Sequence, residues 1–256
     1  MNAIRTAAFT GYFVVVTFLI AVGASPTLIT GGALARGAVK LWARSILWGL
    51  RAICGIAFRI EGAENTPRGG AIVAANHQSM WETIALFALL PDAVMVFKRE
   101  LARVPAYGWW ALRTGSIPVD RAAGAKAIRA LTKAAKSRIA EGRQIVVFPQ
   151  GTRVRVGERG PLMPGVAAIY MATGAPCTTV VHDSGRFWRF PGRLTSLKTP
   201  GIITVRIQPR IDAGLGRRTF IAELERRFAA IEAAPDAAPS APPRSEARAG
   251  DQTARA

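Results

Sequence analysis

The stretch GGAIVAANHQSMWETIALFALL, residues 69–90, decides the fold because it reads as a strand, a turn and a helix in succession. The unbroken apolar run after the two glycines is typical of a strand that is buried on both faces. Asn76 is a residue type favoured at a helix N-cap, and a helical pattern follows it. A strand that leads through a short turn into a helix indicates an α/β domain.

The same alternation continues on both sides of this stretch. Further apolar runs, several bounded by Gly or Pro, predict strands at residues 57–62, 93–98, 115–120, 144–149, 177–182 and 202–208. Helical patterns occupy residues 104–114, 123–142 and 163–174, and we expect Gly142 and Gly174 to cap the last two. The order predicts a mixed, mostly parallel sheet flanked by helices.

The N-terminal segment differs from ordinary globular sequence. Residues 7–24 carry no charge over about 18 positions, which is near the lower limit for crossing a bilayer. A signal peptide is the alternative, since Arg5 and the small residues after the apolar run fit one. We expect membrane-associated helices at residues 1–58, one α/β domain at 59–232, and a disordered, Ala- and Pro-rich tail at 233–256.

Residues 33–58 suggest a helix with a basic stripe. Arg36, Lys40, Arg44 and Arg51 fall within roughly 80° of arc on a helical projection, and most of the remaining surface is apolar or aromatic. One interpretation is a helix that lies in the membrane interface, with its cations beside lipid headgroups. The other is a core helix with one solvated face.

The composition narrows the range of partners that we expect. Lys and Arg outnumber Asp and Glu by 34 to 16, so the formal net charge is +18 and we expect anionic partners. Nucleic acid fits poorly, because no binding motif interleaves aromatic and basic residues and the apolar N-terminus would be unexplained. Cys54 and Cys177 form no paired motif, and two isolated histidines form no ligand cluster. We therefore expect neither a metal nor a cofactor.

His77 and Glu82 suggest acid–base chemistry. Residues five apart within one helix point away from each other, but a histidine in the turn before the helix can reach back to the carboxylate. Glu82 would then bind one ring nitrogen and leave the other able to take a proton. A structural histidine that is merely satisfied by a neighbouring carboxylate is the alternative.

A second apolar run ends in the turn FPQGTR, residues 148–153. Strand ends followed by Gly-containing turns are where α/β folds bind ligands, and Gly151 would let backbone amides approach an anion. Arg153 is able to bind a phosphate through two parallel hydrogen bonds. A solvated basic turn is the alternative.

Together these stretches resemble the glycerolipid acyltransferase family, and within it the bacterial 1-acylglycerol-3-phosphate acyltransferases. The family signature is His, four residues and Asp, followed downstream by Phe-Pro-Glu-Gly-Thr-Arg; here it reads HQSMWE and FPQGTR. Residues 97–121 and 174–185 are similar to the family's intermediate motifs, in the family's order. The sequence departs from the pattern twice, because Glu82 replaces Asp and Gln150 replaces Glu.

The resemblance implies a reaction and a set of site residues. His77, oriented by Glu82, would deprotonate a lysolipid hydroxyl that attacks an acyl thioester directly, since no G-x-S-x-G nucleophile motif is present. The positions that would contact substrate are Lys98, Arg121, Gln150, Gly151, Thr152 and Arg153.

The resemblance also implies the partners and the location. They are lysophosphatidic acid, acyl-CoA or acyl carrier protein as donor, and membrane lipids, at an inner membrane with the active site facing the cytosol. A sister enzyme for another lysolipid, such as lyso-ornithine lipid, and a catalytically silent lipid-binding homologue are the alternatives.

Overall fold

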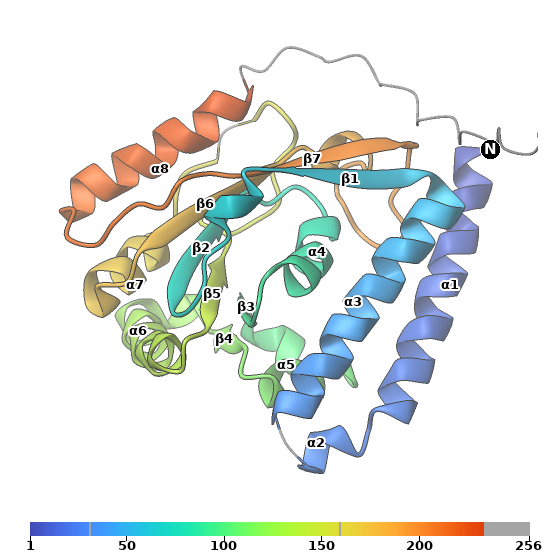
Figure 1. Ribbon diagram of the computed structural model, residues 1–256, viewed down its shortest axis with the longest axis horizontal. Coiled ribbons are helices and arrows are strands. Elements are labelled where there is room, and N and C mark those ends of the chain that lie inside the picture. Colours follow the sequence, from blue (N-terminus) through green and yellow to red (C-terminus); the bar gives the residue numbers. More distant parts are fainter. Residues whose placement is uncertain (31, 159, 233–256) are drawn as a thin grey trace, which may run out of the picture.

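The computed structural model describes residues 1–30, 32–158 and 160–232, and the expected tail at 233–256 lies outside this range (Figure 1). The strands are β1 Ile56–Glu61, β2 Ala71–Ala75, β3 Ala93–Lys98, β4 Ile117–Val119, β5 Gln144–Val147, β6 Cys177–His182 and β7 Gly201–Ile207. The α-helices are α1 Asn2–Gly23, α2 Thr27–Thr30, α3 Gly32–Cys54, α4 Trp81–Leu89, α5 Tyr107–Arg113, α6 Gly124–Ala140, α7 Gly165–Thr173 and α8 Arg217–Glu232.

All the strands form one sheet in the order β1-β7-β6-β2-β5-β3-β4. The pairs are parallel except for β6 and β7, which confirms the predicted mixed, mostly parallel sheet. The strands from β6 to β4 in this order share one direction, so their carboxyl ends meet at one edge. The turns that carry His77, Lys98, Arg121 and Gln150 all follow strands that end there.

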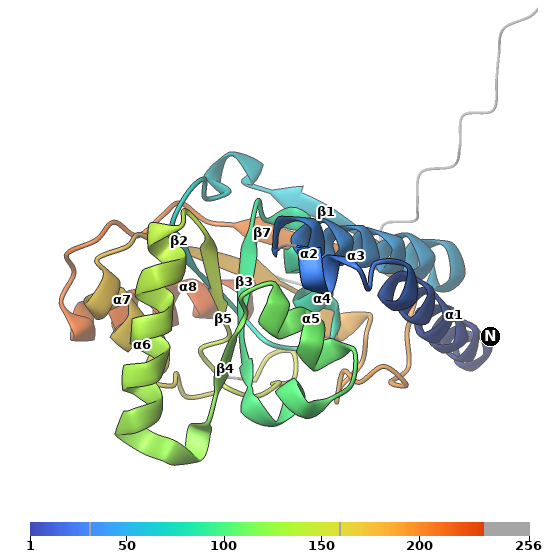
Figure 2. The same ribbon diagram turned by 90° about the horizontal axis from the view of Figure 1, so that it is seen from below.

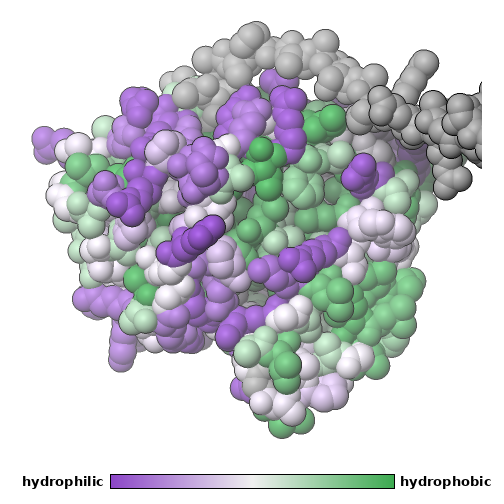
Figure 3. Space-filling model, in the orientation of Figure 1, coloured by the Kyte–Doolittle hydropathy of each residue, from purple (hydrophilic) through white to green (hydrophobic). Residues whose placement is uncertain are grey.

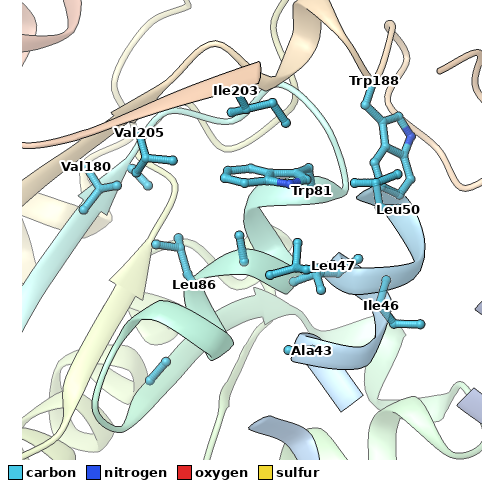
Figure 4. Packing of buried hydrophobic residues seen from close by; sticks show 14 of the residues in the cluster. Ala43, Ile46, Leu47, Leu50, Trp81, Leu86, Val180, Trp188, Ile203 and Val205 are labelled. Atoms are coloured by element: carbon cyan, nitrogen blue, oxygen red, sulfur yellow. The ribbon is translucent and has the colours of Figure 1, made fainter. Parts of the chain in front are cut away.

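Helices cover both faces of the sheet (Figures 1 and 2). On one face, α6, α7 and α8 pack against alternate side chains of β2 and β5, such as Ile72 and Ile145. On the other face α4 lies between the sheet and α3. Figure 4 shows the buried Trp81 ring between Ile203 of β7 and Leu50 of α3. Truncating so large a buried ring typically costs about 3–5 kcal/mol, so Trp81 is a principal anchor for the helix that carries Glu82.

The N-terminal helices form an antiparallel hairpin along the domain. The hydroxyl of Tyr12 donates to the carbonyl of Ser45 at 2.8 Å, and Trp42 Nε1 donates to Thr17 Oγ1 at 3.0 Å. Helix α1 is long and apolar enough to cross a membrane, and only 17% of its most apolar window is buried. Figure 3 shows hydrophobic surface gathered over this hairpin. The length, composition and exposure of α1 therefore suggest membrane association.

The basic residues of α3 lie in two different environments. Arg36 pairs with Asp92 at 3.2 Å, and Lys40 donates to the carbonyl of Pro91 at 3.2 Å, so the start of the stripe contacts the α/β domain. Arg44 and Arg51 are exposed, whereas Ile46 and Leu50 are buried. The first half of the stripe therefore packs on the α/β domain, while the membrane-interface interpretation of the exposed Arg44 and Arg51 stays a prediction. The predicted division at residues 58/59 stays a prediction, and it falls inside β1.

Candidate active site

His77 lies in the turn between β2 and α4, at the sheet edge where the parallel strands end. Its backbone is held on both sides by the turn after β5. The His77 N–H donates to Gln150 Oε1 at 2.7 Å, and the Val154 N–H donates to the His77 carbonyl at 2.9 Å. Two turns that are far apart in the sequence therefore fix the position of one histidine.

The Glu82 carboxylate is fully buried and accepts a dense set of hydrogen bonds. Oε1 accepts from His77 Nδ1 at 2.8 Å and from the backbone N–H groups of Gln78 and Ser79, both at 2.7 Å. Oε2 accepts from the hydroxyls of Ser79 at 2.9 Å and Ser184 at 3.0 Å. Because Ser79 Oγ also accepts from the Trp81 N–H at 3.1 Å, Ser79 and Glu82 form a capping box at the start of α4.

This environment keeps Glu82 ionised. Burial favours the neutral acid, but the charge of His182 and the hydrogen bonds from His77 and Ser79 outweigh it and lower the pKa of Glu82 to about 2. The carboxylate therefore bonds His77 Nδ1, and Nε2 remains as the ring nitrogen available to a substrate. Phe148 stacks on the imidazole with centroids 4.4 Å apart, and the His77 side chain is 16% exposed.

A second layer supports Glu82, and the sequence analysis did not include it in the site. His182 Nε2 lies 3.9 Å from Glu82 Oε2 and 2.9 Å from the carbonyl of Asn76. Burial lowers the pKa of His182, while the Glu82 carboxylate and the hydrogen bond that its Nε2–H donates to that carbonyl act in the opposite direction. Ser79 Oγ and Ser184 Oγ lie 2.8 Å apart beside the same carboxylate oxygen. The Ser-x-x-Glu spacing of residues 79–82 was the available signal for Ser79; His182 and Ser184 had none besides the resemblance.

The predicted N-cap role of Asn76 is wrong. Its amide extends the pairing of β2 with β6 instead, donating to the His182 carbonyl at 2.8 Å and accepting from the His182 N–H at 3.0 Å. The helix begins later, at Trp81, behind the Ser79 capping box. Asn76 thereby fixes the chain just before His77 rather than the helix after it.

The turn after β5 has a different use from the predicted anion loop. The Gly151 N–H donates to the Phe148 carbonyl at 2.9 Å, so this amide is occupied by the turn itself. Gly151 has φ +70°, and a Cβ there would lie 2.9 Å from the Met163 side chain, which explains the glycine. The Gln150 oxygen is bonded to His77, and Thr152 is exposed.

Arg153 is a predicted cation whose charge interacts with Glu82 of the catalytic pair. Its Nη1 donates weakly to the Pro191 carbonyl at 3.4 Å, while its buried Nε has no hydrogen-bond partner within the described residues. Burial lowers the pKa of Arg153, and the nearby Glu82 carboxylate acts in the opposite direction. A half-buried guanidinium with unused donors is suited to an anionic ligand.

Lys98 and Arg121 lie on the β3–β4 side of His77. Lys98 is exposed and pairs with Glu100 at 3.2 Å, while Arg121 donates to the carbonyl of Gly151. Strand pairing sets Lys98 beside Val119, two residues before Arg121. The structure therefore places both cations at the same sheet edge as His77.

Residues 57–183 match the family model described as Acyltransferase. The chain is 35% identical over 196 residues to the 1-acyl-sn-glycerol-3-phosphate acyltransferase of Pseudomonas aeruginosa, an alignment that covers 76% of this chain and 75% of that protein. This similarity shows that the chain belongs to the acyltransferase family, and within it to the 1-acylglycerol-3-phosphate acyltransferases.

Another relative agrees with this assignment, and a solved structure supports the fold. The enzyme of the same name from Helicobacter pylori is 34% identical over 115 residues, covering 43% of this chain and 48% of that one. The crystal structure of the 1-acyl-sn-glycerophosphate acyltransferase PlsC from Thermotoga maritima matches with a TM-score of 0.70 at 21% identity. It covers 91% of this chain and 100% of that chain, and it supports the fold.

Proposed function

We propose that this protein transfers a fatty acyl group from a thioester donor to the free hydroxyl of 1-acylglycerol-3-phosphate, giving phosphatidic acid. The observation that carries the proposal is the hydrogen bond of 2.8 Å between His77 Nδ1 and a buried, ionised Glu82, which leaves Nε2 as a base at the sheet edge. The named activity of the Pseudomonas relative supports the choice of acceptor.

The reaction follows from that arrangement. His77 Nε2 takes the proton of the acceptor hydroxyl as its oxygen attacks the thioester carbonyl carbon. The new C–O bond forms a tetrahedral oxyanion, which collapses as the C–S bond breaks. The departing pantetheine thiolate recovers the proton from His77, so the enzyme returns to its starting state without a covalent intermediate.

Glu82 contributes by fixing the imidazole and by stabilising its charge. A carboxylate with a pKa of about 2 stays ionised at neutral pH, so it faces the imidazolium that forms during proton transfer. The extra methylene of glutamate relative to the family's aspartate does not prevent a contact of 2.8 Å. Gln150 needs only its oxygen for the bond to the His77 N–H, which a glutamate would supply equally. Both departures are therefore compatible with activity.

The phosphate of the acceptor is assigned to Arg153, with Lys98 and Arg121 at the β3–β4 side of the same edge. The donor is acyl-CoA or acyl carrier protein. The N-terminal hairpin would hold the α/β domain at the cytosolic face of the inner membrane, where the lysolipid is found. Residues 1–58 would then be the membrane-associated part and residues 59–232 the catalytic part.

The test is an assay of purified membranes that contain the protein, with a panel of lysolipids and with both donors. The proposal predicts transfer to lysophosphatidate above transfer to lyso-ornithine lipid. A preference for the phosphate-free acceptor would identify a sister acyltransferase. No transfer to any member of the panel would support the silent lipid-binding homologue.

A further inference from the structure

An open hollow of about 600 Å³ lies beside the catalytic pair and is not used by the mechanism above. It is formed by the segment after Arg153 and by the segment after β6. The lining residues are Arg155, Val156, Gly185, Arg186, Arg189 and Phe190. Three of these six residues are arginines, so the hollow is suited to an anion.

The walls of the hollow are joined directly to the turn that carries His77. The Gly185 N–H donates to Gln78 Oε1 at 3.0 Å, and Gln78 follows His77 in the chain. The opposite wall continues from Val154, whose N–H donates to the His77 carbonyl at 2.9 Å. A molecule seated in the hollow would therefore lie near the turn that carries His77 but outside the catalytic pair, because neither His77 nor Glu82 lines the hollow.

Lys98 and Arg121 follow β3 and β4, on the other side of His77. The site thus has basic groups on two sides of one base. Acyl transfer brings two anionic substrates to that base, an acceptor with a phosphate and a donor whose pantetheine arm ends in a phosphate. The two basic regions would give each anionic substrate its own binding site, one on either side of His77.

The hollow also has apolar surface beside its cations. The Arg155 guanidinium lies 4.7 Å from the centroid of the Phe190 ring, and the exposed fractions of Val156 and Phe190 are 39% and 44%. Arg155 meets Glu158 only at 3.7 Å, with both side chains more than 60% exposed, so this pair is weak. Guanidinium groups next to apolar surface suit a phosphate that terminates a long uncharged arm.

We propose that the hollow binds the phosphate at the end of the donor's pantetheine arm, the group that acyl-CoA and acyl carrier protein share. The inference rests on the proposed acyl transfer and deepens it. The arm holds its phosphate well away from the thioester, so the donor's phosphate site must lie at some remove from His77. Arg153, whose charge interacts with Glu82, is better placed for the acceptor.

The experiment compares wild type with the double variant Arg155→Gln/Arg189→Gln, using acyl-CoA, acyl carrier protein and an S-acyl-pantetheine that has no phosphate. Loss of two charge-assisted contacts should lower kcat/KM for the phosphate-bearing donors at least about tenfold. The value for S-acyl-pantetheine and the KM for lysophosphatidate should not change. The matched control is Arg217→Gln/Arg218→Gln on α8, which removes the same charge from exposed positions and should have no effect.

Each result has a defined meaning. Equal losses with S-acyl-pantetheine, or a raised KM for lysophosphatidate, would overturn the proposal. A loss confined to the carrier-protein donor would also overturn it, because it would indicate protein–protein contacts. A loss confined to acyl-CoA would likewise overturn it, because the arginines would then contact the ADP half of CoA, which the carrier protein lacks. Calorimetric titration with CoA tests the donor site independently of the proposed function. If CoA binding depends on the two arginines but no acyl group is transferred to lysophosphatidate, only the proposed acceptor is contradicted.

Discussion

Glu82 Oε1 accepts a hydrogen bond of 2.8 Å from His77 Nδ1, and the same oxygen accepts the two backbone N–H groups that begin the turn into α4. One carboxylate therefore both starts a helix and orients an imidazole. Because the carboxylate cannot move without breaking the turn, the orientation of His77 is a property of the fold.

Glu82→Gln should lower kcat by about 10²-fold or more, since an amide cannot stabilise the imidazolium and can favour the wrong tautomer. The KM for the acyl donor should change little. Steady-state kinetics of the purified variant check this. A variant with wild-type kcat would show that the carboxylate has no part in catalysis.

The same substitution should change the pH dependence of stability. The pKa of Glu82 is about 2 in the folded chain against 4.5 ordinarily, so its stabilising effect is present above pH 4.5 and is lost as the pH falls through 2. The difference in unfolding free energy between wild type and Glu82→Gln should therefore shrink between pH 5 and pH 2, measured by denaturant titration. A constant difference over that range would contradict the buried charge.

Gln150→Glu should keep activity, while Gln150→Ala should not. The alanine variant leaves the partly buried N–H of His77 without its acceptor, which costs about 1 kcal/mol or more of stability. Thermal unfolding measures the loss of stability in each variant, and lysolipid assays measure the loss of activity. If the alanine variant were as active as wild type, the clamp on His77 would be unnecessary.

Arg153→Lys should stay impaired, because a point charge on a flexible stem cannot reproduce the paired hydrogen bonds of a guanidinium. The loss should be larger on lysophosphatidate than on lyso-ornithine lipid. The comparison is kcat/KM for both acceptors, wild type against variant. Equal proportional losses would mean that Arg153 supports the loop at Pro191 instead.

The exposed face of α1 should control membrane binding separately from stability. Phe18→Ser/Leu19→Ser changes side chains that are 65% and 61% exposed, so it should reduce flotation with liposomes while leaving unfolding unchanged. Phe9→Ala is the matched contrast, because Phe9 is fully buried and its ring lies 5.7 Å from that of Trp188. It should cost about 3–5 kcal/mol of stability. Unchanged flotation of the double variant would locate the anchor elsewhere.

The sheet could be predicted because each strand is an apolar run with a clear end. Residues 93–98 and 177–182 were predicted with the bounds that β3 and β6 have. Helix α8 was not predicted, since its packing depends on Phe220 and Leu224 within a strongly charged segment. The split of the α3 stripe also escaped prediction, because Asp92, the partner of Arg36, lies far along the chain.

For the site, the spacing of His77 and Glu82 predicted their contact, since the turn between them is local. The supports from Ser184 and His182 could not be predicted, because they reach Glu82 only through the pairing of β6 with β2. The Gly151 N–H is used by the turn itself, so that one amide is not open to an anion, and the anion-binding role of the turn stays a prediction.

The most direct measurement is the turnover of His77→Ala on lysophosphatidate with a saturating acyl donor. The account predicts a loss of about 10²- to 10⁴-fold in kcat, the usual effect of removing a general base. The variant should stay folded and its liposome flotation should match wild type, while its unfolding temperature should fall because the buried Glu82 carboxylate loses the hydrogen bond from His77. Retention of more than about a hundredth of wild-type turnover in a folded, membrane-bound variant would contradict the central claim that His77 is the base.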